Sequence, residues 1–195
     1  FVAEPKIDGL SASLLYVNGV LQVGATRGDG RTGENVTDNL KTLGEDQIPI
    51  RLKGSDWPAR IEVRGEVFAP TEAFLAFNTA AEAAGERTYA NPRNFAAGSL
   101  RQKNPAITAT RPLSFFAYAW GEPAEGFSDT QSGALEMLAA WGFVTNDRST
   151  RVEGVEGLVN VYRGLDADRA RLGYDIDGVV YKVDRLDWQQ RLGFI

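Results

Sequence analysis

The stretch Glu4-Pro5-Lys6-Ile7-Asp8-Gly9 stands near the start of the chain, directly before a β-patterned run from Leu10 to Val17. Lys6 is a candidate nucleophile, because a lysine amine attacks phosphorus or carbonyl centres when it is neutral. Such a lysine needs a pKa below its reference value of about 10.4, which desolvation or a nearby cation provides. Apolar Pro5 and Ile7 beside Lys6 favour desolvation. The alternative is a surface lysine at the start of a strand, and this stretch alone does not decide between them.

Asn18-Gly19 separates the run Leu10 to Val17 from a second β-rich run, Val20 to Arg27. Both positions of a two-residue turn must tolerate positive φ, so this dipeptide predicts a β-hairpin. A regular hairpin would place Arg27 opposite Leu10, on the face that strand alternation gives to Lys6, Asp8 and Leu10. If the extended conformation also continues backwards from Lys6, Glu4 shares this face. A cation there would suit a phosphate and would lower the lysine pKa.

The composition predicts one globular domain. The chain has 195 residues, of which 43% are hydrophobic and 24% charged, and no apolar run is long enough to span a membrane. It contains neither Cys nor His, which excludes disulfides and cysteine-ligated zinc and leaves acid–base chemistry to Asp, Glu, Lys, Tyr, water or a metal. The net charge of -5 argues against a generally basic nucleic-acid binder. We expect a cytoplasmic protein, and the first residue, Phe1, suggests an excised fragment.

Gly28 to Gly33 matches the dinucleotide fingerprint G-x-G-x-x-G and precedes a plausible helix, Glu34 to Leu43. A Rossmann oxidoreductase is therefore an alternative function. The preceding strand is the second arm of a hairpin, however, and no series of βαβ units follows. We therefore interpret this stretch as a glycine-rich turn beside an active site.

Further elements follow from hydrophobic periodicity. Ile61 to Phe68 alternates as a strand with Glu66 on its charged face, and Leu113 to Trp120 is an aromatic strand with Phe116, Tyr118 and Trp120 on one face. The remaining predicted elements are helices at Pro70 to Ala84, Arg93 to Gln102, Ala134 to Trp141 and between Val155 and Arg171, and a strand at Tyr174 to Val183.

Lys6-Ile7-Asp8-Gly9 resembles the signature of lysine-adenylating nucleotidyltransferases, which include DNA ligases, RNA ligases and mRNA-capping enzymes. Further runs resemble, in order, the adenylation domain of bacterial NAD-dependent DNA ligases: "ATRGDGRTGENVTDN" (25 to 39), "EVRGEVF" (62 to 68), "ANPRNFAAGSLRQ" (90 to 102), "RPLSFFAY" (111 to 118) and "DIDGVVYKV" (175 to 183). The resemblance covers residues 1–195. It implies an α+β nucleotidyltransferase fold, ATP-grasp-like, with mostly antiparallel sheets flanked by helices.

The resemblance also implies a mechanism. Lys6 would attack the α-phosphate of NAD+, releasing nicotinamide mononucleotide and leaving AMP on the lysine, for later sealing of nicked duplex DNA in replication and repair. Asp8 would orient Lys6 or the metal, and Asp177 would hold Mg2+ (or Mn2+). The residues implied to contact phosphates are Arg27, Arg93 and Arg101; Arg169 has a weaker claim. Arg93 and Arg101 lie eight residues apart in the predicted helix, about 80° around its axis, so we expect them to contribute to one surface.

Recognition of the adenosine is implied for four more residues. Glu4 and Lys182 would recognise adenine, Tyr118 would stack on its ring and Glu66 would bind the ribose. Asp177 and Lys182 are five residues apart, so an unbroken strand would place them on opposite faces. Because the resemblance places both at the site, we predict a bulge or bend at Gly178.

In this family a nicotinamide-binding segment precedes such a domain, and OB-fold, zinc and helix-hairpin-helix modules follow it. We expect those parts to lie outside this chain, which would then not seal DNA alone. We expect a monomer without membrane partners, acting on DNA at the nucleoid. The alternatives are an ATP-dependent polynucleotide ligase or capping-type nucleotidyltransferase, and a non-catalytic DNA-binding module.

Overall fold

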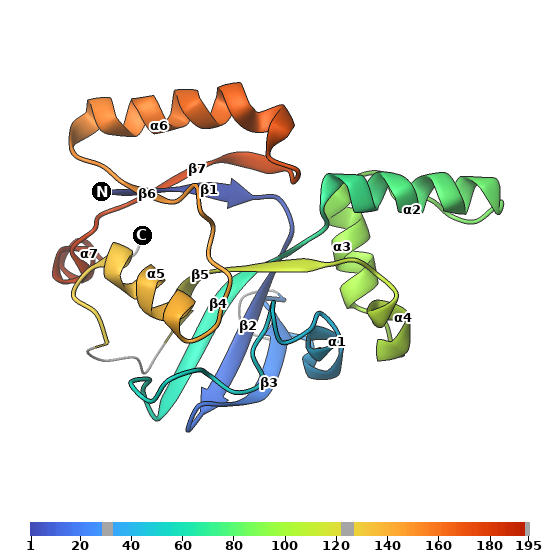
Figure 1. The fold of residues 1–195 in the computed structure, drawn as a ribbon, viewed down its shortest axis with the longest axis horizontal. Helices are drawn as coiled ribbons and strands as arrows, with labels where there is room; N and C mark the ends of the chain where they lie inside the picture. The colour runs from blue at the N-terminus through green and yellow to red at the C-terminus, as the bar shows by residue number, and fades with distance from the viewer. Residues whose placement is uncertain (29–32, 122–126, 194–195) are drawn as a thin grey trace.

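The chain folds around two antiparallel sheets in the computed structural model, which describes residues 1–28, 33–121 and 127–193 (Figure 1). The smaller sheet has the strand order β6-β1-β7, and the larger one β3-β2-β4-β5. The strands are β1 (Val2–Ile7), β2 (Leu10–Val17), β3 (Val20–Thr26), β4 (Arg60–Phe68), β5 (Ser114–Gly121), β6 (Thr150–Arg151) and β7 (Ile176–Lys182). The α+β class with antiparallel sheets and flanking helices is confirmed.

The chain passes from the smaller sheet to the larger one between β1 and β2, at Asp8 and Gly9. A Cβ atom on Gly9 would lie 2.2 Å from the Val67 carbonyl oxygen of β4, so the crossing requires glycine. The prediction that strand alternation continues from Lys6 through Asp8 to the next strand is wrong, because the chain changes sheets between them.

The β2–β3 hairpin forms at Asn18-Gly19, where Asn18 has a φ of 47° and Gly19 one of 73°. Its register shifts by one residue two pairs from the turn, which leaves Gln22 as an extra residue of β3. The Arg27 backbone N–H therefore donates to the Ser11 carbonyl at 3.3 Å. The predicted pairing of Arg27 with the first residue of β2 is wrong by one position.

The predicted helices are present, with ends shifted by a few residues. They are α1 (Thr37–Lys41), α2 (Thr71–Ala83), α3 (Pro92–Leu100), α5 (Gln131–Ala140) and α6 (Gly154–Asp168), and the structure adds α4 (Pro105–Ala109) and α7 (Leu186–Leu192). Asn91 caps α3 by accepting from the Asn94 backbone N–H at 2.8 Å, and Thr130 caps α5 in the same way.

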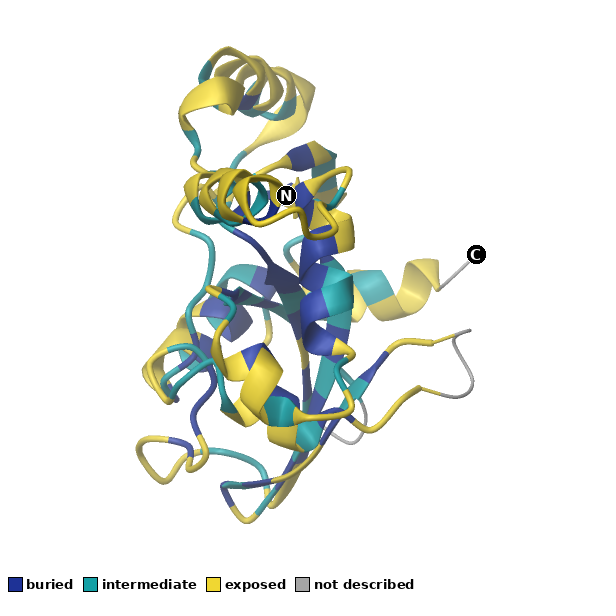
Figure 2. Ribbon diagram, turned by 90° about the vertical axis from the view of Figure 1, so that its right-hand side faces the viewer, coloured by how far each residue is buried: buried dark blue, intermediate teal, exposed yellow. Residues whose placement is uncertain are grey.

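The main core lies on one face of the larger sheet. Leu14, Ile61 and Phe115 are fully buried there, and Leu40 of α1 and Leu138 of α5 pack against them. Helix α6 lies along the smaller sheet (Figure 1), while α6 and α7 expose most of their residues (Figure 2). No helix of the described residues is long and apolar enough to cross a membrane.

The fingerprint from Gly28 to Gly33 lies mostly outside the described residues. All strand pairs among the described residues are antiparallel. A Rossmann fold requires parallel strands joined by crossover helices, so the oxidoreductase alternative is wrong.

Candidate active site

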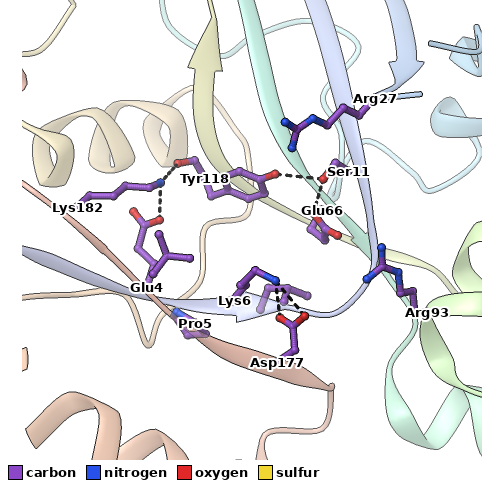
Figure 3. Close-up of a pocket in the computed structure, with 12 residues that line it drawn as sticks. Glu4, Pro5, Lys6, Ser11, Arg27, Glu66, Arg93, Tyr118, Asp177 and Lys182 are labelled. Carbon is purple, nitrogen blue, oxygen red and sulfur yellow. Dashed lines mark hydrogen bonds and ion pairs between the residues drawn. The ribbon is translucent and has the colours of Figure 1, made fainter. Parts of the chain in front are cut away.

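A cavity of about 320 Å³ lies between the two sheets and collects most of the predicted site residues. Figure 3 shows their side chains converging from β1 and β7 on one side and from β2, the end of β3, β4, β5 and α3 on the other. Its lining includes Glu4, Lys6, Ser11, Arg27, Glu66, Arg93, Tyr118, Asp177 and Lys182. Of the predicted set, Asp8 and Arg101 are not part of it.

The Lys6 amine faces Asp177 across the smaller sheet. Its Nζ lies 2.9 Å from both carboxylate oxygens of Asp177 (Figure 3). The predicted burial of Lys6 is wrong, since its side chain is 55% exposed and that of Asp177 is 40% exposed. Apolar Pro5 and Ile7 line the same cavity but leave the amine exposed to solvent. The ion pair therefore stands at the open side of the cavity.

A β-bulge brings Asp177 to this position. The register of β1 with β7 shifts opposite Lys6, where Asp177 and Gly178 together face this single residue. Gly178 has a φ of 147°, a conformation that side chains rarely adopt. The predicted bulge at Gly178 is confirmed, and it lets Asp177 and Lys182 reach the same cavity although they are five residues apart.

The deep end of the cavity holds a second ion pair. Glu4 is 4% exposed, and its Oε2 lies 2.6 Å from the Lys182 amine. That amine also donates to the Tyr118 carbonyl oxygen at 3.1 Å, and Gln131 donates to Glu4 Oε1 at 3.1 Å. Glu4 reaches the cavity of Lys6 because residues two apart in β1 share a face. This end thus presents a carboxylate, an ammonium and an aromatic ring together.

Between these ion pairs, Ser11 links Glu66 to Tyr118. The Ser11 hydroxyl donates to Glu66 Oε2 at 3.0 Å, and its oxygen lies 3.4 Å from the Tyr118 hydroxyl (Figure 3). Burial raises the pKa of the Glu66 carboxyl, and the Ser11 hydrogen bond and the charge of Arg93 offset part of that rise. Burial likewise raises the pKa of the Tyr118 phenol. The middle of the cavity therefore carries hydrogen-bonding groups suited to a polyhydroxylated ligand.

Tyr118 is itself the extra residue of a bulge in β5. The β4–β5 register shifts around it, so Phe116 pairs with Glu66 while Trp120 pairs with Val63. Paired residues share a face of the sheet, and Val63 belongs to the core. The predicted common face of Phe116, Tyr118 and Trp120 is therefore wrong, because the bulge turns Trp120 towards the core.

The arginines divide between the cavity and its surroundings. Arg27 and Arg93 line it, and Arg93 Nη1 lies 3.5 Å from Asp8 Oδ1. The Asp8 carboxylate thus faces Arg93 instead of Lys6. Arg101 follows the last residue of α3 with a ψ of 44°, is exposed and donates to the Ala97 carbonyl at 3.4 Å. The expected common surface of Arg93 and Arg101 on one regular helix is therefore wrong. Arg169 donates to the Ile176 carbonyl oxygen at 2.9 Å.

The Lys6 amine, the Glu4–Lys182 ion pair and two arginines thus line one cavity, and a comparison with known families accounts for this arrangement. The model of the NAD-dependent DNA ligase adenylation domain matches residues 1–195. The chain belongs to this family. Members of the family are enzymes that use NAD+ and a divalent metal such as Mg2+.

Curated relatives agree with the family match. A DNA ligase of Caulobacter vibrioides (strain NA1000 / CB15N) is 64% identical over 196 residues, covering 100% of this chain and 25% of the relative. DNA ligases of Phenylobacterium zucineum (strain HLK1) and Maricaulis maris (strain MCS10) are 60% and 61% identical, covering 100% and 99% of this chain. The chain spans 28% and 27% of those two proteins, so it corresponds to about a quarter of its relatives' length.

The family uses a divalent metal, but few side chains that could bind one lie close together among the described residues of this adenylation domain. Among the described residues, no group of three or more acidic or His side chains could hold a metal ion by itself. Mg2+ commonly takes one or two protein carboxylates and completes its octahedron with substrate phosphates and water. Asp177 fits that pattern, because its partly exposed carboxylate lines the cavity beside Lys6. The residues present therefore suit a metal that is bound together with the nucleotide.

Two residues that hold the site together, Ser11 and Gln131, were not predicted from the sequence. Ser11 could have been found from strand pairing, because it lies directly opposite Glu66 in the β2–β4 register. Gln131 has no such signal, since it is separated from Glu4 by 127 residues and meets it only through the packing of α5.

Proposed function

We propose that this adenylation domain transfers the adenylyl group of NAD+ to Lys6. The observation that carries the proposal is the convergence of the Lys6 amine with an adenosine-sized polar cavity, whose two ends are marked by Asp177 and by the Glu4–Lys182 pair. A solvated lysine at a strand end would not face such a cavity. The chain therefore supplies a nucleophile and a binding site for the adenosine half of NAD+.

The reaction forms a bond between Lys6 Nζ and the α-phosphorus and breaks the bond from that phosphorus to the bridging oxygen. Nicotinamide mononucleotide leaves with that oxygen and its electron pair, and AMP stays on the lysine as a phosphoramidate. Lys6 must lose a proton before it attacks, and Asp177, at 2.9 Å, is positioned to accept it. Mg2+ held by Asp177 together with the phosphates would offset the charge that builds on phosphorus.

The other lining residues bind and orient the nucleotide. Lys182 can donate to adenine N1, and Glu4 can accept from its amino group, while the Tyr118 ring offers a stacking surface. The Glu66 carboxylate can accept from ribose hydroxyls. Arg27 and Arg93 contact the phosphates and stabilise the transition state electrostatically, and Asp8 acts through Arg93, which it pairs with.

The test is intact-mass analysis after incubation with NAD+ and Mg2+, with peptide mapping of the modified residue. We expect one AMP adduct on Lys6 and none on a Lys6→Ala chain. Parallel incubation with ATP distinguishes NAD+ from the substrate of the other lysine-adenylating enzymes. An adduct that persists in the Lys6→Ala chain, or one that forms with ATP and not with NAD+, would refute the proposal.

In the longer protein, we propose that AMP passes from Lys6 to the 5'-phosphate of a nick in duplex DNA, and that a 3'-hydroxyl then displaces it. The relatives are DNA ligases about four times as long as this chain, and the remaining modules would supply most of the DNA contacts. Exposed Arg101 is suited to a DNA phosphate. We expect a monomeric protein that works at the nucleoid in replication and repair. A nick-sealing assay with Arg101→Ala in the full-length protein should show slower sealing but unchanged formation of the Lys6 adduct.

A further inference from the structure

One buried polar side chain behind the cavity, that of Gln131, has no part in the proposed adenylyl transfer. Gln131, the first residue of α5, is 2% exposed and is not part of the cavity lining. Its Nε2 donates to Glu4 Oε1 at 3.1 Å and approaches the Tyr118 carbonyl oxygen at 3.5 Å. Its Oε1 accepts from Gln189 of α7 at 3.3 Å. The side-chain amide of Gln131 thus has a hydrogen-bond partner on its nitrogen and another on its oxygen. These two partners fix the orientation of the amide.

The backbone around Gln131 is also held in place. Its N–H donates to the Asp184 carbonyl at 2.6 Å, and the next N–H, of Ser132, donates to Asp184 Oδ1 at 2.9 Å. Thr130 caps the helix by accepting from the Gly133 N–H at 3.0 Å. The start of α5 is therefore attached to the segment between β7 and α7, and Gln131 has little freedom to move away from Glu4.

Two donors from different elements hold the Glu4 carboxylate. Lys182 of β7 takes Oε2 and Gln131 of α5 takes Oε1, which fixes the carboxylate plane and leaves its remaining lone pairs as acceptors. Because an amide N–H only donates, Gln131 holds the Glu4 carboxylate in the orientation in which Oε1 accepts its hydrogen bond. Fully paired buried networks specify geometry in this way.

We propose that Gln131 is a positioning residue that keeps Glu4 an acceptor and thereby sets the preference of the cavity for adenine over hypoxanthine. The inference rests on the proposed function, in which Glu4 and Lys182 read the base. Adenine presents an N6 amino donor and an N1 acceptor, whereas hypoxanthine presents an O6 acceptor and an N1–H donor. The Glu4 acceptor, fixed beside the Lys182 donor, therefore matches the hydrogen-bonding groups of adenine. It is mismatched to those of hypoxanthine.

The experiment compares the binding of AMP and inosine monophosphate by calorimetry in the wild-type chain and in Gln131→Met. We expect the wild type to prefer AMP, and Gln131→Met to lose about tenfold of that preference, the size expected for one hydrogen bond to a charged group. Asn39→Leu is the matched control, because Asn39 is 6% exposed and donates to Thr108 and to the Gln102 carbonyl away from the cavity. It should lower the melting temperature and leave the preference unchanged.

A second variant keeps the test decisive if Gln131→Met does not fold. Gln189→Met, in partly exposed surroundings, removes the donor to Gln131 Oε1 and should reduce the preference about threefold, less than Gln131→Met does. An unchanged preference in the folded Gln131→Met chain, an equal loss in Asn39→Leu, or a wild type that binds both mononucleotides equally would overturn the inference and leave the adenylyl transfer standing. A wild type that binds neither would overturn both.

Discussion

Ser11→Ala tests how the middle of the cavity is maintained. The substitution removes the hydroxyl that donates to Glu66 Oε2 at 3.0 Å. A hydrogen bond to a charged group contributes about 1.5–3 kcal/mol. Glu66 keeps the backbone N–H of Gly9 and the charges of Arg93 and Lys6, so we expect the lower end, a loss of about 1.5 kcal/mol near neutral pH. For a domain of this size that corresponds to a fall in melting temperature of about 3–6 °C.

The loss should depend on pH. Burial raises the pKa of folded Glu66 above its ordinary value of 4.5, so the folded chain binds more protons than the unfolded one between those two values. The contribution of Glu66 to stability is therefore greatest below the ordinary value and declines as the pH rises through the folded pKa. Ser11 stabilises the charged form, so its removal should cost most above the folded pKa. At more acid pH the loss should shrink towards the roughly 0.5 kcal/mol of a neutral hydrogen bond.

Ser13→Ala is the matched control, two residues along the same strand. Its hydroxyl donates to Glu62 Oε1 at 2.6 Å. Burial would raise the pKa of Glu62, but hydrogen bonds from Arg64 and Ser13 and the charge of Arg64 outweigh it and hold the pKa below its ordinary value. A depressed pKa contributes stability above the ordinary value that is lost only as the pH falls through the folded pKa. The cost of Ser13→Ala should therefore stay constant between pH 8 and about pH 5.

Urea unfolding followed by tryptophan fluorescence, at several pH values between 8 and 4, measures both variants without the screening that a salt denaturant adds. A loss in Ser11→Ala that is as large at pH 4, below the ordinary pKa, as at pH 8 would refute this account of Glu66. So would a stronger pH dependence in Ser13→Ala than in Ser11→Ala between pH 8 and pH 5. Binding of AMP to Ser11→Ala at pH 8 should also weaken about tenfold. The Ser11 hydroxyl orients Glu66, which is the residue proposed to bind the ribose.

Three further predictions follow from the ion pairs and the bulge. Lys182→Met leaves the Glu4 carboxylate buried without a cation and should lower the free energy of unfolding, measured in urea, by about 3–5 kcal/mol. Adding Glu4→Gln should recover most of this loss. No recovery would contradict the pairing of Glu4 with Lys182. Asp177→Asn removes a partly exposed pair, so stability should change by less than about 0.5 kcal/mol. In Asp177→Asn the rate of AMP-adduct formation on Lys6, followed by intact mass, should fall at least about 100-fold. A normal rate would exclude proton transfer to Asp177. Gly178→Ala forces a side chain to a φ of 147° and should cost about 1–3 kcal/mol while slowing adduct formation; unchanged stability would show that the bulge is not strained.

Local rules predicted the parts of the site that depend on neighbours in the chain. Glu4 and Lys6 reach one cavity because residues two apart in a strand share a face. The hairpin at Asn18-Gly19 follows from the turn dipeptide alone. The bulge at Gly178 needed more, since it was inferred only from the family's placement of two residues that a regular strand would separate.

Those local rules could not predict the register of the strands or the packing of distant segments. A one-residue shift in β3 moved Arg27 next to Ser11, and one in β5 turned Trp120 to the core. Neither shift leaves a mark in the alternation of the sequence. The end of α3 likewise removed Arg101 from the regular helix surface on which the sequence had placed it.

The sequence by itself determined the chemistry available to this protein: an amine flanked by carboxylates and arginines, an aromatic strand, and no thiol or imidazole to compete with them. The tertiary structure alone decided which of these groups meet. Strand register accumulates along a sheet, so a single inserted residue reverses every face beyond it. Contacts such as Gln131 with Glu4 join segments 127 residues apart, and only the tertiary packing of α5 brings them within hydrogen-bonding distance.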